Sequence, residues 1–198
     1  SEKKEHEAQL ERLANEDSLT GLATRHAFLA RMPAMLAQAQ VANIGAALLF
    51  IDLDEFKHVN DTHGHATGDQ LLKSAAIRLL SLLRPSDQVA RFGGDEFVVL
   101  LSPCDGERQA ASVAARIVDA FGVPFLIGDE LHAVGASIGI SLYPRDGADA
   151  ETLVRHSDIA MYAGKNDGKG QYRFFDPSLS STLNARARLK QRMLEALE

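Results

Sequence analysis

Residues 91–101 read RFGGDEFVVLL, and two glycines and two acids stand there between an aromatic residue and an apolar run. The strand-like runs DQVARF and EFVVLLS flank the segment Gly93, Gly94 and Asp95. Glycine supplies the positive φ that a tight turn needs, so the pattern predicts an antiparallel hairpin. Asp95 and Glu96 would then lie at the hairpin tip, with a buried strand behind them.

Residues 44–54, IGAALLFIDLD, form a continuous apolar run that ends in acids, which indicates a central strand buried on both faces. Asp52 and Asp54 flank Leu53 at the exit of this strand. Carboxylates at the ends of adjacent strands can converge on one hard cation, and Mg²⁺ favours such oxygen ligands together with phosphates. A lone Asp-x-Asp is more often a solvated turn. The nearby Gly-Gly-Asp-Glu favours the metal interpretation, because glycine lets a ligand approach the backbone closely.

The rest of the chain mixes helical and strand patterns. Apolar residues at helical spacing predict four helices, and Pro33 is a possible irregularity in the first of them. The predicted helices cover residues 24–40, 67–83, 105–121 and 148–168, and further strands cover residues 131–144 and 172–176. Hairpins replace strict alternation of strands and helices. We therefore expect an α+β fold, with helices covering the faces of the sheet.

The composition restricts the function. A chain of 198 residues suits one main domain, and a net charge of −6 disfavours non-specific binding to nucleic acid or to anionic membranes. The apolar run at residues 44–51 is far shorter than the roughly 20 residues that span a bilayer. Cys104 is the only cysteine and cannot form an internal disulfide, which fits a reducing cytoplasm.

Several motifs, in the same order, resemble the GGDEF family of diguanylate cyclases. They are DSLTGL near the start, IDLDEFKHVNDTHGHATGD, and RFGGDEF, and the resemblance covers residues 17–176. It implies a fold like that of nucleotidyl cyclases and polymerase palms, with a mostly antiparallel central sheet flanked by helices. It also implies condensation of two GTP into cyclic di-GMP and two pyrophosphates. The implied activity also uses two Mg²⁺ (or Mn²⁺) ions per site. It requires a homodimer, in which each of two facing domains holds one GTP.

The resemblance implies that the metal ligands are Asp52, the backbone carbonyl of Leu53, and Asp95, with Glu96 at the fourth acidic position. Metal ions at such a site neutralise the triphosphate, orient the α-phosphorus and help a 3′-hydroxyl lose its proton before in-line attack. Asp95 or Glu96 could take that proton, and the sequence leaves this choice open.

The same resemblance makes Asn60 and Asp69 the residues that read guanine. A carboxylate accepts hydrogen bonds from the N1–H and 2-amino groups, which adenine cannot supply in that pattern, so GTP would be preferred over ATP. Without the resemblance, helix capping would be the simpler interpretation of both residues. The resemblance also implies that Gly93 and Gly94 form the turn under the nucleotide. It implies that the phosphates are contacted by Phe56, Lys57, Lys165 and Lys169.

A second site is implied at Arg84 and Asp87, which match the spacing of the family's RxxD inhibitory motif for the cyclic di-GMP product. The fork of an arginine suits guanine O6 and N7. The alternative is an arginine that merely ends a helix beside Pro85. His63 and His65 could suggest a further metal site, but the family has a histidine in this GHxxGD stretch that is not a ligand, so neither is expected to bind metal.

The ends of the chain indicate a larger parent protein. Residues 1–16 are charge-rich and read as a signalling helix that continues from an upstream sensor. Residues 177–198 become polar and then helical, and resemble the linker to a following EAL phosphodiesterase domain. The sequence leaves open whether the parent is anchored in a membrane. Two alternatives to a cyclase remain: a catalytically silent regulatory domain that binds GTP or cyclic di-GMP in a tandem phosphodiesterase, and a different nucleotidyltransferase that shares the metal-binding acids.

Overall fold

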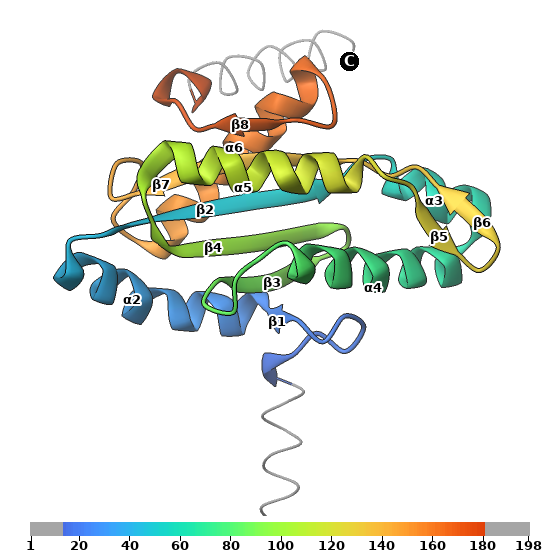
Figure 1. Cartoon of the computed structure of the whole chain (residues 1–198), viewed down its shortest axis with the longest axis horizontal. Helices are drawn as coiled ribbons and strands as arrows, with labels where there is room; N and C mark the ends of the chain where they lie inside the picture. The colour runs from blue at the N-terminus through green and yellow to red at the C-terminus, as the bar shows by residue number, and fades with distance from the viewer. Residues whose placement is uncertain (1–13, 181–198) are drawn as a thin grey trace, which may run out of the picture.

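One central sheet organises the molecule in the computed structural model, which describes residues 14–180 (Figure 1). The strand order is β1-β3-β4-β2-β7-β8. The inner pairs β3–β4, β4–β2 and β2–β7 are antiparallel, whereas the outer pairs β1–β3 and β7–β8 are parallel. The prediction of an α+β fold with a mostly antiparallel sheet is confirmed. The strands of this sheet are β1 (Ala23–Thr24), β2 (Gly45–Leu53), β3 (Gln88–Gly93), β4 (Glu96–Cys104), β7 (Ala136–Tyr143) and β8 (Tyr172–Phe174).

Helices cover both faces of the sheet (Figure 1). Helices α2 and α6 pack on one face, and α4 and α5 pack on the other together with the short α3. The bounds are α2 (Arg25–Ala42), α3 (Phe56–His63), α4 (His65–Ser81), α5 (Gly106–Phe121) and α6 (Ala150–Asp167). Strands β5 (Phe125–Ile127) and β6 (Glu130–His132) form a separate two-stranded hairpin. No helix within residues 14–180 is both long enough and apolar enough to cross a membrane.

The alternation of side chains along β2 explains its continuous apolar run. Leu48 and Phe50 pack into the core under α2 and α6, whereas Leu49 and Ile51 pack into the core under α3, α4 and α5. Successive side chains of a strand point to opposite faces, so a strand covered on both sides must be apolar at every position. Asp52 continues the series of Leu48 and Phe50 and lies on the α2 and α6 face.

The sequence-based prediction of one strand over residues 131–144 is wrong. The chain pairs with β5 as far as His132 and joins the central sheet only at Ala136. Between them, the carbonyl of Gly135 accepts a hydrogen bond from the backbone N–H of Asp54, at 2.9 Å. A Cβ at Gly135 would lie 3.2 Å from Asp54 Oδ2, a tight contact that would push the Asp54 carboxylate by a few tenths of an ångström. The break lets the chain pass close to the acidic end of β2.

The helix N-termini are capped in different ways. Thr24 is the N-cap of α2 and its hydroxyl accepts a hydrogen bond from the N–H of Ala27, at 3.2 Å. Helix α2 runs through Pro33 without a break. Asp105 is the N-cap residue of α5, but its side chain makes no capping hydrogen bond. Helix α3 was not predicted at all. Residues 1–13 and 181–198, which hold most of the expected signalling helix and linker, lie outside the described residues.

Candidate active site

Two carboxylates from neighbouring strands meet at one end of the sheet. The register of β2 and β4 pairs Asp52 with Glu96, and both side chains lie on the α2 and α6 face. The hairpin tip is tied to the same place, because the N–H of Leu53 donates a hydrogen bond to the carbonyl of Asp95, at 3.2 Å. Gly93 and Gly94 have φ values of 139° and 49°, as the predicted turn requires. The structure thus brings together all four positions for which metal binding is expected.

The electrostatics of this corner favour a cation. Burial is the largest cause that raises the pKa of Asp52, and the charges of Asp95 and Asp54 add to it, although a hydrogen bond from Lys165 acts in the opposite direction. Burial also raises the pKa of Glu96, and the nearby Asp158, Asp52 and Asp95 raise it further. Crowded carboxylates of this kind are relieved by a divalent ion, and an all-oxygen donor set suits Mg²⁺ or Mn²⁺. The residues present therefore fit such an ion.

The second aspartate of the Asp-Leu-Asp sequence has a structural role. Asp54 is buried, and its carboxylate accepts hydrogen bonds from the hydroxyl of Ser137, at 2.8 Å, and from the N–H of Gly170, at 2.9 Å. These contacts join the end of β2 to β7 and to the loop after α6. Asp54 therefore holds the backbone of Gly170, the residue after Lys169, whereas Asp52 is the aspartate paired with Glu96 in the acidic corner.

The two lysines predicted to contact phosphates lie beside these acids. Lys165, in the last turn of α6, makes an ion pair with Asp52, and Lys169 makes an ion pair with Glu55. Glu55 adopts a left-handed conformation, with φ of 62°, immediately before α3. Phe56 and Lys57, the other predicted phosphate contacts, form the start of α3, where backbone N–H groups lack partners within the helix.

The predicted guanine-reading residues lie on two packed helices. Asn60 is inside α3 and Asp69 is inside α4, so a helix-capping role is wrong for both, since the N-cap residues are Glu55 and Gly64. Sequence reasoning missed Gly68, which is buried against Asn60. A Cβ at Gly68 would lie 1.8 Å from Asn60 Oδ1. The glycine in the GHxxGD stretch was the available signal, because glycine often marks a close approach.

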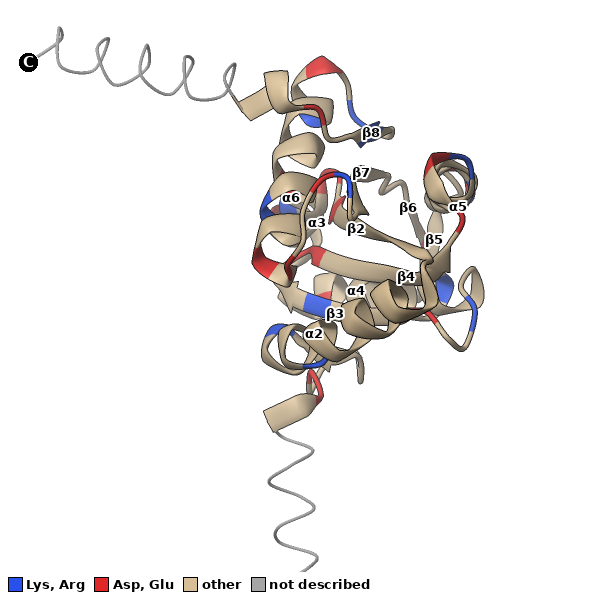
Figure 2. Cartoon of the chain, turned by 90° about the vertical axis from the view of Figure 1, so that its left-hand side faces the viewer, with Lys and Arg blue, Asp and Glu red and all other residues tan. Residues whose placement is uncertain are grey.

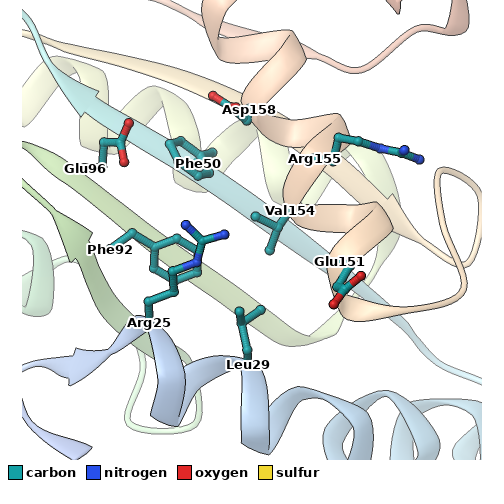
Figure 3. A pocket seen from close by; sticks show the side chains of 9 residues that line it. All are labelled: Arg25, Leu29, Phe50, Phe92, Glu96, Glu151, Val154, Arg155 and Asp158. Carbon is teal, nitrogen blue, oxygen red and sulfur yellow. The ribbon is translucent and has the colours of Figure 1, made fainter.

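A cavity of about 460 Å³ adjoins the acidic corner, between α2 and α6 (Figure 3). Glu96 lies at one end of it, and Figure 3 shows Arg25 over Phe92 on the α2 side, with the guanidinium carbon 5.3 Å from the ring centroid. Asp158 and Arg155 line the α6 side. Figure 2 shows Lys and Arg interspersed with Asp and Glu over this side of the molecule. Sequence reasoning assigned neither arginine to the site, because the cavity joins segments more than a hundred residues apart.

Arg91 connects the hairpin tip to the beginning of the described chain. Its guanidinium donates to the carbonyl of Gly94, at 2.8 and 3.0 Å, and to the carboxylate of Asp17, at 3.1 and 3.2 Å. Asp17 also accepts hydrogen bonds from the N–H and hydroxyl of Thr20. Burial alone would raise the pKa of Asp17, but these hydrogen bonds outweigh it and hold that pKa below its usual value. The DSLT turn is therefore linked to the Gly-Gly turn through Arg91.

Arg84 and Asp87 lie far from the acidic corner. They form a turn after α4, in which the N–H of Arg84 donates to the Asp87 carboxylate at 2.8 Å. Arg84 is exposed and lines a cavity of about 530 Å³ with residues at the beginning of β2 and the end of β4, such as Gly45 and Cys104. The acids Asp52 and Glu96 stand at the opposite ends of those two strands. Arg84 and the acidic corner therefore lie at opposite ends of β2 and β4, so a ligand bound at Arg84 would not occupy the acidic corner.

Comparisons with known proteins agree with this geometry. A family model described as the diguanylate cyclase GGDEF domain matches residues 14–171. DgcE of Escherichia coli, a probable diguanylate cyclase, is 42% identical over 180 residues, which are 90% of this chain and 16% of DgcE. MucR of Pseudomonas aeruginosa, a bifunctional diguanylate cyclase and cyclic di-GMP phosphodiesterase, is 38% identical over 190 residues, which are 96% of this chain and 28% of MucR. The chain thus spans less than a third of these relatives.

The solved structure of the GGDEF domain of TpbB from Pseudomonas aeruginosa superposes on the chain with a TM-score of 0.83. The two chains are 38% identical, and the match covers 85% of this chain and 99% of that domain.

Proposed function

Because the chain belongs to the GGDEF family, we propose that it is a diguanylate cyclase, which condenses two GTP into cyclic di-GMP and two pyrophosphates. The observation that carries the proposal is the intact acidic corner: Asp52 and Glu96 are paired across β2 and β4, with the Asp95 turn hydrogen-bonded to Leu53. A silent regulatory domain would not need this corner to be complete. We further propose that the domain works in the cytoplasm as part of a larger protein, with an EAL domain after it.

In the proposed reaction, the 3′-hydroxyl oxygen of one GTP attacks the α-phosphorus of the other. The bond from that phosphorus to the bridging oxygen breaks, pyrophosphate leaves, and a second identical step closes the ring. Asp95 or Glu96 accepts the hydroxyl proton. When bound by Asp52, Glu96, Asp95 and the Leu53 carbonyl, two Mg²⁺ or Mn²⁺ ions would neutralise the triphosphate and polarise the α-phosphoryl group.

The chain's other residues bind and orient the nucleotide in this proposal. Lys165 and Lys169 exchange their carboxylate partners for the β- and γ-phosphates, so the ion pairs with Asp52 and Glu55 hold them close to where they are needed. The N–H groups at the start of α3 bind the terminal phosphates. Asn60 and Asp69 bind guanine, which selects GTP over ATP.

The first test is product analysis by HPLC after incubating the purified protein at high concentration with GTP and Mg²⁺. We expect cyclic di-GMP from the wild type and none from Asp95→Ala, and no cyclic product from ATP. Binding of GTP by a demonstrated dimer without any product would instead support the silent regulatory domain. Equal turnover of ATP would support a different nucleotidyltransferase.

Catalysis in this proposal needs two GTP-loaded domains facing each other, so activity should depend on dimerisation. We expect the turnover per chain to rise with protein concentration through the range in which light scattering shows monomers becoming dimers. A turnover per chain that stays constant across that range would contradict the requirement for a second domain.

We propose that cyclic di-GMP inhibits the enzyme by binding at Arg84 and Asp87. Arg84 is exposed beside a cavity large enough for a nucleotide, and its fork suits guanine. For Arg84→Ala we expect product inhibition to weaken by about tenfold or more, which corresponds to the loss of one charge-assisted pair. Rates measured with and without added cyclic di-GMP check this, with Arg31→Ala, an exposed arginine of α2, as the control. Full inhibition of the Arg84 variant would rule the site out.

A further inference from the structure

Three side chains that the proposed cyclase site does not use meet between α3 and the β5–β6 hairpin. They are His63 at the end of α3, and Glu130 and His132 on β6. One ligand-capable atom from each of the three lies within 4.8 Å of the other two. His63 Nδ1 is 3.3 Å from Glu130 Oε2, and His132 Nε2 is 4.0 Å from the same oxygen. The imidazole rings lie edge to face, with centroids 4.7 Å apart.

Contrary to the expectation from the sequence that His63 binds no metal, we propose that His63, Glu130 and His132 bind a divalent transition metal ion of the Zn²⁺ type. Two imidazole nitrogens and one carboxylate oxygen are a ligand set of three-residue zinc sites, which keep a further position open. Imidazole ligands select Zn²⁺, Co²⁺ or Ni²⁺ rather than Mg²⁺, which prefers oxygen. The site therefore differs in chemistry from the all-oxygen corner at Asp52 and Glu96.

Two of the three ligand separations are close to those of a tetrahedral site. Bonds of 2.0–2.1 Å place two tetrahedral ligands about 3.4 Å apart. The separation of 3.3 Å between His63 and Glu130 matches this value, and the separation of 4.0 Å between His132 and Glu130 needs a shift of less than 1 Å. The Glu130 side chain is 69% exposed and can make that shift without disturbing the core.

The burial of the three ligands suits capture of an ion from solvent. The His132 side chain is only 5% exposed, and its residue pairs with Phe125 of β5, so this ligand is held in place. His63 is 38% exposed, and Glu130 lies two residues before His132, on the same face of β6. One fixed ligand and two ligands open to solvent leave a path by which the ion can enter.

Metal binding would join two parts of the molecule that are far apart in the sequence. His63 is three residues after Asn60 on α3, whereas Glu130 and His132 belong to the separate hairpin. A bound ion would therefore clamp the end of α3 to that hairpin and stabilise the fold. The proposal does not depend on cyclase activity, because it concerns binding at a different set of residues.

The test is calorimetric titration of the tag-free protein with Zn²⁺, and absorption spectroscopy with Co²⁺, both with excess Mg²⁺ present to compete at the oxygen site. We expect a Zn²⁺ binding event that raises Tm, and Co²⁺ absorption bands typical of a tetrahedral site. Single replacements of the two exposed ligands, His63→Ala and Glu130→Ala, should each weaken binding by at least about tenfold. His65→Ala, an exposed histidine two residues from His63, is the matched control and should bind as the wild type does.

Either of two results would overturn the proposal. One is that every Zn²⁺ binding event of the wild type disappears in Asp52→Asn, so that Zn²⁺ binds only at the oxygen site. The other is unchanged Zn²⁺ affinity in both His63→Ala and Glu130→Ala. Because both replaced side chains are exposed, neither variant should fail to fold, and circular dichroism checks this.

Discussion

We expect Glu96→Gln to lower cyclic di-GMP formation by about 10²–10⁴-fold, the loss typical of a removed catalytic acid or base, and to raise the Tm of the metal-free protein. The activity falls because the amide neither accepts a proton nor supplies negative charge to a metal ion. The stability rises because the folded state penalises an ionised Glu96. Burial and the nearby charges of Asp158, Asp52 and Asp95 raise the pKa of this group, so its ionised form is less favourable in the folded chain than in the unfolded chain.

The sign of the pH dependence follows from that raised pKa. The neutral carboxyl of Glu96 is less costly to the folded state than the ionised one. Its stabilising effect is fully present below the ordinary pKa of 4.5 and is lost as the pH rises through the folded-state pKa. The Tm advantage of Glu96→Gln should therefore be absent below pH 4.5 and fully present once Glu96 is ionised in both states.

Calorimetry in EDTA across this pH range, together with HPLC of the product, checks both parts of the prediction. Asp119→Asn, at an exposed acid of α5 outside the site, is the control and should change neither activity nor Tm. A Tm for Glu96→Gln at or below that of the wild type at neutral pH would contradict the electrostatic account, whatever the activity. Retention of wild-type activity would contradict the catalytic one.

The elements that sequence patterns predicted are those whose signals are local. The apolar run of β2 and the Gly-Gly turn at Gly93 and Gly94 each need only their own residues to be recognised. Helix α3 has no such signal, because FKHVNDTH has only Phe56 and Val59 as buried residues and is rich in residues of modest helix propensity. Its packing against α4 and the sheet decides its structure.

The candidate site shows the same limit. The residue pattern alone cannot separate Asp52 from Asp54, since both flank Leu53 at the end of the same strand, and only the family resemblance selected Asp52. Their roles differ only because Ser137 and Gly170 occupy the carboxylate of Asp54, from positions 83 and 116 residues away. The meeting of His63 with Glu130 is of the same kind, and no spacing rule would have revealed it.

The second large effect is expected for Gly68→Ala, which should weaken GTP binding by about 10–100-fold, as the loss of a charge-assisted or buried hydrogen bond does. The new Cβ would lie 1.8 Å from Asn60 Oδ1 and 2.9 Å from its Cγ, so the Asn60 side chain must rotate away from α4. The helix itself should tolerate the change, because Gly68 lies within α4 and alanine is the better helix former by about 1 kcal/mol. The variant should therefore remain folded but bind guanine more weakly.

A double-mutant cycle distinguishes this mechanism from a general disturbance of α4. If Gly68→Ala acts by displacing Asn60, then Asn60→Ala should cause a similar loss, and the double variant should bind GTP no more weakly than the weaker of the two single variants. Titration calorimetry with a non-hydrolysable GTP analogue measures the affinities. Gly164→Ala in α6, where the added Cβ would meet its nearest neighbour at an ordinary 3.5 Å, is the matched glycine control. If the losses of GTP binding free energy add in the double variant, Gly68 acts through something other than Asn60. The close packing of Gly68 on Asn60 would then not explain the guanine site.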